Sequence, residues 1–317
     1  MGADRFGSAR QLILALSAWI LVSILALKFG AVSDADLELV VGLRLPRVVL
    51  ASAVGAGLAV AGAVLQALFS NPLCEPYTLG ISSGAAVGAV VGAAAGFEWS
   101  FAGLAGSAFV GALLCTAILY AISLRVAGNL ALLLAGVMLG FLGSSLVALW
   151  MALADSNGIS AALSWLLGDL SRARTGGSLF AAVAIGLLLA ALWTKWRDLD
   201  AFLMGSEAAL SLGVPVGRVR RRTVFITSLV VGICVSAGGM IGFVGLVVPH
   251  FVRRFAGSLH FRLIPLCAVW GAVALVAADA LARVAARPYE LPVGVVTALA
   301  GAPLFLWVML RRHGEAR

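Results

Sequence analysis

The sequence has 317 residues, of which 62% are hydrophobic and only 11% are charged, with a mean hydropathy of +1.09. Soluble chains have about 45–50% apolar and about 25% charged residues, so this composition excludes a soluble globular protein. The formal net charge of +8 comes from cations scattered between apolar stretches. It therefore indicates topology rather than nucleic-acid binding, because Lys and Arg concentrate on cytoplasmic loops of membrane proteins.

The apolar stretches predict an all-α polytopic membrane protein, because about 20 mainly apolar residues cross a hydrocarbon core. The first stretch follows Arg5 and Arg10 and looks like a secretory signal, but we expect a retained span because many more follow it. In chain order, ten transmembrane helices are expected, at residues 11–28, 48–69, 79–97, 101–124, 130–154, 176–196, 222–238, 240–252, 263–282 and 291–310.

The seventh and eighth expected spans are short and could instead form one long helix. With ten spans and a cytoplasmic N-terminus, 15 of the 22 cations lie on the cytoplasmic side, whereas merging the two spans leaves only 9 there. The excess of cations on cytoplasmic loops favours ten spans. We therefore expect a single transmembrane domain over residues 1–317 with both termini in the cytoplasm.

The longest expected cytoplasmic connection covers residues 197–222. Within it, residues 201–212 have the pattern of a short amphipathic helix, with Ser206 and Glu207 suited to its start and Gly213 to its end. A second short helix is expected at residues 161–168, on the outer side.

Several kinds of chemistry are missing from the sequence. It has no GxxxxGK[ST] phosphate loop and no HExxH motif, so we expect neither ATP binding nor enzymatic activity in this chain. The four cysteines form no CxxC pair, and His250 stands without ligand partners, so no metal site is expected. These absences weigh against a polytopic membrane enzyme.

The acidic residues bear on the energy source. Asp155, Asp169, Asp279 and Glu290 fall near the outer ends of spans, and Glu75 is assigned to the inner side, so the middles of the spans are nearly uncharged. A proton-driven secondary transporter would be expected to carry ionisable groups inside the membrane. We therefore expect another subunit to supply the driving force.

Three stretches go beyond composition. They are LRLPR at residues 43–47 leading to QALFSNPLCEPYTLGISSGA at 66–85, GFVGLVVPH at 242–250 followed by Arg253, and ELPVGVVTA at 290–298 continuing to GAP at 301–303. Together they resemble the FecCD-type permeases, the membrane subunits of ABC importers for iron-siderophores, haem and cobalamin. The likeness covers nearly the whole chain in order.

The resemblance implies the ten-helix fold of a cobalamin-importer permease, a type II ABC importer. It further implies an inner-membrane homodimer around a central pathway, surrounded by membrane lipid, with no bound nucleic acid. Two cytoplasmic ABC ATPase subunits would bind ATP and Mg²⁺, and this chain would bind no cofactor. A periplasmic or lipid-tethered binding protein would deliver the cargo. A ferric siderophore or haem is the preferred cargo, and cobalamin is the alternative.

The resemblance also assigns roles in the cytoplasmic loop. Residues 207–213 match the EAA-then-glycine pattern with which such permeases contact their ATPases, although an ordinary surface helix is the alternative. The arginines from Arg218 to Arg222 would anchor this loop on the ATPase or at lipid headgroups. The expected coupling residues are Glu207, Ala208, Ala209, Gly213, Arg218 and Arg220.

On the outer face, Arg44, Arg47 and Arg283 match family arginines that pair with glutamates of the binding protein, and solvated loop arginines are the alternative. Rim charges of this kind set orientation and association rate. Arg172 and Arg174 precede the sixth span, and we expect them to attract an anionic cargo such as a ferric siderophore or the propionates of haem.

The last assignment concerns the pathway. Gly128, Asn129 and Leu130 occupy the place of the family's cytoplasmic gate, but Gly128 and Leu130 depart from the small hydroxyl residues of the cobalamin importer. Ser144 and Ser145 in the fifth span would line the route, or else bond to their own helix.

Overall fold

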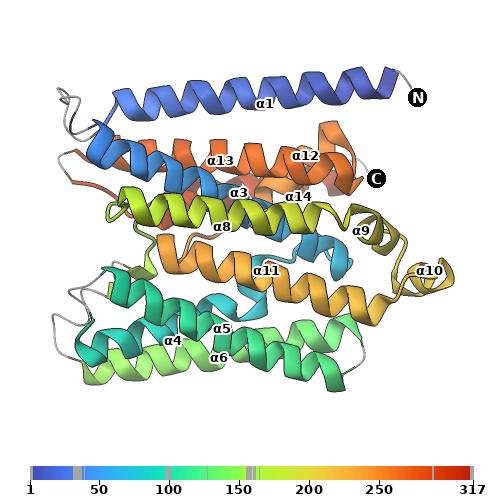
Figure 1. Cartoon of the computed structure of the whole chain (residues 1–317), viewed down its shortest axis with the longest axis horizontal. Coiled ribbons are helices and arrows are strands. Elements are labelled where there is room, and N and C mark those ends of the chain that lie inside the picture. The colour runs from blue at the N-terminus through green and yellow to red at the C-terminus, as the bar shows by residue number, and fades with distance from the viewer. Residues whose placement is uncertain are drawn as a thin grey trace.

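The computed structural model describes residues 3–30, 38, 40–97, 101–126, 128–154, 159, 162–163, 165–287 and 289–314, and every regular element in these ranges is a helix. The longer helices lie side by side along one direction (Figure 1), with α1 at one edge and α4, α5 and α6 at the other. The helices are α1 (Ala3–Lys28), α3 (Leu45–Leu68), α4 (Ile81–Gly92), α5 (Phe101–Arg125), α6 (Asn129–Leu153), α8 (Thr175–Trp193), α9 (Trp196–Phe202), α10 (Ser206–Ser211), α11 (Val216–Gly238), α12 (Val244–Ala256), α13 (His260–Val284) and α14 (Val293–Gly314).

The all-α polytopic class is confirmed, because each of the ten expected spans coincides with a helix. Among the described helices, seven are long and apolar enough to cross a membrane. Two shorter apolar segments, Ile81–Phe97 and Val293–Leu306, correspond to the third and tenth expected spans. The eighth corresponds to α12, which has only 13 residues. Length and composition thus support seven of the ten expected crossings.

Helix α3 forms the centre of the bundle and packs against α8, α11, α12 and α13. Apart from Arg47, Ser52 and Gln66 it is apolar on all sides, as expected for a buried helix. Small residues bring its neighbours close: a Cβ on Gly55 would lie 2.2 Å from the carbonyl oxygen of Gly271 in α13. Such spacing lets backbones approach in a medium where helix association depends on packing.

A non-helical linker, residues 239–243, separates α11 from α12, so the two expected spans are separate helices. Gly239 and Phe243 have φ of 71° and 68°, outside the right-handed helical region. Helix α12 then runs back toward the end of the bundle that carries α9. Its Gly245 packs on Gly62, its Arg253 reaches Gln66 one helical turn further along α3, and the following His260 contacts α9.

The first and last described residues lie at the same end of the bundle as α9 and α10 (Figure 1). This arrangement agrees with an even number of crossings. At the opposite end lie the C-terminus of α1 and the N-termini of α3 and α8.

The loop that was expected in the cytoplasm differs from the expected single helix at residues 201–212. It forms two short helices, α9 and α10, because Gly205 adopts a φ of 94° and interrupts the helical path between them. Phe202, at the end of α9, is fully buried and holds α9 against the bundle. The short outer helix expected at residues 161–168 lies partly outside the described residues, and Trp165 and Leu166 within it are helical.

Candidate functional site

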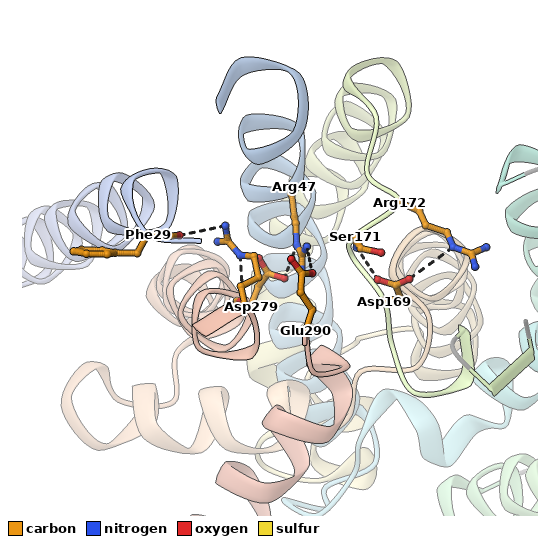
Figure 2. A network of polar contacts seen from close by, with 8 residues as sticks. Phe29, Arg47, Asp169, Ser171, Arg172, Asp279 and Glu290 are labelled. Carbon is orange, nitrogen blue, oxygen red and sulfur yellow. Dashed lines mark hydrogen bonds and ion pairs between the residues drawn. The ribbon is translucent and has the colours of Figure 1, made fainter. Parts of the chain in front are cut away.

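Four charged side chains form a cluster at the end of the bundle opposite α9 and α10 (Figure 2). Arg47 of α3 places its Nε 2.8 Å from Asp279 Oδ1 and its Nη1 2.7 Å from Glu290 Oε2. Arg283 Nε lies 3.1 Å from the second carboxylate oxygen of Asp279, which is only 1% exposed. The cluster therefore joins α3 to α13 through the buried carboxylate of Asp279, and α3 to the loop before α14 through Glu290.

Arginines of the same end also bind the C-terminus of α1. Arg44 Nη1 donates to the carbonyl oxygens of Leu27 and Lys28, at 2.8 and 3.0 Å. Arg283 Nη1 donates to the carbonyl of Phe29 at 3.4 Å, and Arg287 Nη2 donates to that of Gly30. The last carbonyls of a helix lack intrahelical partners and favour nearby cations. These contacts hold α1 against α3 and α13.

The three arginines expected to contact a binding protein are buried in this structure. Arg44, Arg47 and Arg283 are 6%, 8% and 3% exposed and donate to groups of this chain. An arginine that is paired with a buried carboxylate is not available to a partner unless that pair breaks. Docking of a binding protein through these three residues stays a prediction.

Arg172 and Arg174, the residues expected to attract cargo, are exposed at this same end. Arg172 Nε lies 3.7 Å from Asp169 Oδ2, and Asp169 Oδ1 accepts the backbone N–H of Ser171 at 2.7 Å (Figure 2). Arg174 lines a cavity of about 430 Å³ whose walls are mostly apolar side chains of α5, α8 and α11. Both arginines are thus on the surface, and Asp169 partly neutralises the charge of Arg172.

The expected coupling residues lie around α10, at the other end. Glu207 is exposed in the first turn of α10, whereas Ala208 is half-buried and Ala209 fully buried. Gly213 follows α10 with a φ of 82°. Arg218 is exposed and Arg220 half-buried in the first turns of α11. Around them the loop exposes four large apolar side chains, those of Leu203, Met204, Leu210 and Leu212.

A polar contact that sequence reasoning missed fastens this loop to the bundle. Asp200 of α9 accepts the backbone N–H of His260 at 2.7 Å, and the same oxygen lies 2.7 Å from His260 Nδ1. His260 is fully buried at the start of α13, not in an exposed loop. This contact therefore connects α9 directly to α13.

The expected gate lies at the start of α6. Gly128 precedes α6 with a φ of 121°, and Leu130 is exposed. The side chain of Asn129 lies outside the described part of the chain. Ser144 and Ser145 are exposed on α6, whose Gly136 and Gly143 pack against the turn before α4 and against Ser83 of α4.

Glu75 departs most from expectation. Its carboxylate accepts the backbone N–H of Phe243 at 2.6 Å, and Tyr77 Oη accepts the N–H of Ile241. The linker between α11 and α12 lies alongside the middle of α3, because Gly238 faces Val54 and Gly245 packs on Gly62. Non-helical backbone at membrane depth requires such internal partners. Glu75 is therefore inside the bundle, not on the inner surface where sequence reasoning placed it.

The same region contains a second buried polar contact. Arg253 of α12 donates through Nη1 to Gln66 Oε1, and Gln66 Nε2 donates to the carbonyl of Gly245 at 3.2 Å. His250 packs edge to face with Phe305 of α14. The motif of residues 242–250 thus joins α12 to α3 and α14. Among the described residues, no three His, Cys, Asp or Glu side chains gather in a way that could hold a metal ion.

A bundle of long apolar helices, with polar contacts between its helices and an exposed loop at one end, is compatible with a membrane transport protein of the permease class. The chain belongs to the FecCD transport family, which it matches over residues 11–311, and it is an ABC importer permease.

Individual relatives support this assignment. The chain is 40% identical over 290 residues to the vitamin B12 import system permease protein BtuC of Vibrio cholerae, covering 90% of this chain and 86% of that protein. It is 38% identical over 295 residues to the hemin transport system permease protein HmuU of Yersinia pestis, covering 89% and 86%. A solved structure described as an inward-facing conformation of a metal-chelate type ABC transporter aligns with a TM-score of 0.89 and 30% identity, covering 96% and 99%.

Proposed function

We propose that this permease translocates a bulky metal chelate, a ferric siderophore or haem, that a substrate-binding protein delivers. The names of similar proteins support a large cargo, since one is a hemin permease, another a B12 permease and a third a metal-chelate type transporter. The single observation that favours an anionic chelate is the exposed pair Arg172 and Arg174 at one end of the bundle. Clustered cations raise the local concentration of an anionic ligand.

The partners follow from the same family. We propose a homodimer in the inner membrane, with both termini in the cytoplasm and two ATPase subunits that bind ATP and Mg²⁺. The four exposed apolar side chains around α10 offer a docking surface for an ATPase. Ser144 and Ser145 support the packing of a second copy of this chain against α6. Two hydroxyl groups on an otherwise apolar exposed surface cost less free energy in contact with protein than in contact with lipid.

The geometry suggests how ATP hydrolysis moves the bundle. An ATPase that binds α10 moves α9, and the contact between Asp200 and His260 transmits this movement to α13. Helix α13 packs along α3, and Gln66 of α3 is held by Arg253 of α12. A displacement of the loop thus shifts central helices together, as rigid elements rocking between two access states. The cargo passes without covalent chemistry.

The test is uptake by proteoliposomes that contain the permease, its ATPase and its binding protein. Haem, a ferric siderophore and cobalamin are supplied separately to wild type, to Arg172→Ala combined with Arg174→Ala, and to Lys28→Ala. Lys28 is a matched control, because it is an exposed cation at the same end of the bundle. We expect the double variant to lower uptake of the anionic chelate about tenfold, within the range known for electrostatic steering, and Lys28→Ala to leave uptake unchanged.

Cobalamin is the second candidate, and the 40% identity to a B12 permease favours it. Uptake of cobalamin alone by wild type would establish that alternative. Equal uptake of every cargo by the double variant and wild type would refute the role of the two arginines in attraction.

A further inference from the structure

A basic cavity lies at the end of the bundle that carries α9 and α10. It has a volume of about 430 Å³ and lies between the C-terminus of α8, α9 and the first turns of α11. Lys195, Arg218 and Arg222 line it together with a single acidic residue, Asp198. Within the described residues, the side chains of these three cations make no hydrogen bond or ion pair. Three cations against one carboxylate leave the cavity with an excess of positive charge.

Apart from Thr223, the remaining residues that line the cavity are apolar. Val219, Phe225 and Ile226 continue along α11 from the cations toward the middle of the bundle. Phe225 is exposed on the outside of the helix. A ligand that fits has an anionic head beside the cations and an apolar tail along α11.

Aromatic side chains place this cavity at the level of a membrane surface. Trp193 and Trp196 flank Lys195 in the chain and both contact Phe261, with ring centroids 5.5 and 5.4 Å apart. The indole N–H of Trp193 donates to the carbonyl of Phe261, and Arg197 lies over the ring of Trp196. Trp residues concentrate where lipid headgroups meet the hydrocarbon core. The cations therefore lie at headgroup depth and Phe225 on the hydrocarbon side.

We propose that this cavity binds the phosphate headgroup of an anionic membrane phospholipid, with one acyl chain along Phe225 and Ile226. Basic pockets between transmembrane helices are known to hold anionic headgroups. Such a lipid would bridge α8, α9 and α11, next to the loop that contacts the ATPase. The proposal requires only that the chain lies in a membrane and is independent of the cargo.

The experiment measures lipid retained by the purified full-length permease in detergent, using native mass spectrometry. Dioleoyl phosphatidylglycerol and dioleoyl phosphatidylcholine are added separately to wild type, to Lys195→Gln combined with Arg222→Gln, and to Arg125→Gln combined with Arg254→Gln. Arg125 and Arg254 are matched controls, because both are exposed cations near that end of the bundle that do not line the cavity. Equal thermal unfolding midpoints verify that the variants fold.

We expect wild type to prefer phosphatidylglycerol, and the loss of Lys195 and Arg222 to lower its affinity roughly 20-fold, as two cations at headgroup depth imply. The control pair should stay close to wild type. Asp198→Asn removes the only acidic side chain that lines the cavity and should raise the affinity for phosphatidylglycerol about fivefold. A misfolded variant would not show such an increase in affinity.

Three results would overturn the proposal. The first is equal binding of the two lipids by wild type. The second is full displacement of phosphatidylglycerol by inorganic phosphate, which would identify a site for a free anion. The third is loss of the bound lipid when the ATPase assembles, together with loss of ATPase binding in the Lys195 and Arg222 variant, because the cavity would then be an ATPase contact.

Discussion

Asp279 is the residue on which two buried guanidinium groups depend. Its two carboxylate oxygens lie 2.8 Å from Arg47 Nε and 3.1 Å from Arg283 Nε, and the residue is 1% exposed. Removing one member of a buried pair leaves the partner charge without compensation. We therefore predict that Asp279→Asn destabilises the permease by about 3–5 kcal/mol, as is typical of a broken buried ion pair. The thermal unfolding midpoint in detergent measures the change.

Glu290 supplies the matched control for this prediction. It accepts from the same Arg47 at 2.7 Å, but its side chain is 36% exposed. A pair that shares water contributes little, so Glu290→Gln should cost about 1 kcal/mol or less. If the two variants unfolded at the same temperature, the carboxylate of Asp279 would not be the centre of the cluster.

Asp200 connects α9 to α13 through its contacts with His260. Asp200→Ala removes the acceptor shared by the backbone N–H and Nδ1 of His260, and so separates α9 from α13. We predict that transport by the assembled complex falls about tenfold, equivalent to about 1.4 kcal/mol, while the ATPase still co-purifies and hydrolyses ATP.

The conservative variant distinguishes coupling from folding. Asp200→Asn keeps an oxygen for the N–H of His260 and should transport at a rate between those of Asp200→Ala and wild type. Uptake and hydrolysis are measured in the same proteoliposomes. Unchanged uptake by Asp200→Ala would contradict a role for this contact in transmitting movement.

At the scale of elements, the packing of α12 on α3 depends on the absence of a side chain. A Cβ on Gly62 would lie 1.8 Å from the carbonyl oxygen of Gly245, so α12 would have to move away. Overpacking of this kind costs about 1–3 kcal/mol, and we predict a loss of that size for Gly62→Ala. Thermal unfolding in detergent measures it.

Gly186 in the middle of α8 is the matched control, because a Cβ added there would meet nothing within 4 Å and its φ is not positive. Alanine is favoured over glycine inside a helix, so Gly186→Ala should gain roughly 0.5–1 kcal/mol. A loss of stability in both variants would show that these helices respond to any added methyl group rather than to the contact with α12.

The elements differ in how far the sequence predicts them. Hydrophobic stretches located every long helix, because length and apolarity are local properties. The break at Gly205 was missed, since a glycine inside an amphipathic pattern does not reveal a φ of 94°. Glu75 was assigned to the wrong place for a related reason. Its partner Phe243 is 168 residues away in the sequence. Only the folded bundle shows that the segment after α3, which carries Glu75, lies beside the linker that carries Phe243.

The candidate sites show the same limit. The arginines at residues 44, 47 and 283 were recognised as important from their motifs and from their place outside the expected cytoplasmic side. Whether an arginine faces water or a buried carboxylate depends on distant residues such as Asp279, which no local pattern contains. The contact between Asp200 and His260 joins positions 60 residues apart and had no sequence signal.

At the scale of the molecule, the two ends of the bundle differ in chemistry. One end has the buried ion pairs and the exposed Arg172 and Arg174. The other has α9, α10, the basic cavity and the described chain ends. An importer needs this asymmetry, because cargo enters at one face and ATP acts at the other. The orientation in the membrane decides which end performs which task.

Cysteine labelling tests that orientation. All four native cysteines are buried, so a membrane-impermeant maleimide should react little with the wild-type chain. Met204→Cys adds a thiol between α9 and α10, where Met204 is 71% exposed, and Ser171→Cys adds one at the opposite end, where Ser171 is also exposed.

If Lys and Arg mark the cytoplasmic face, the thiol at position 171 is labelled in intact spheroplasts and the thiol at position 204 reacts only after the membrane is opened. The ratio of labelling before and after opening measures each position independently of expression level. The opposite pattern would reverse the orientation, placing the apolar surface around α10 out of reach of a cytoplasmic ATPase and ruling out the coupling route through Asp200 and His260.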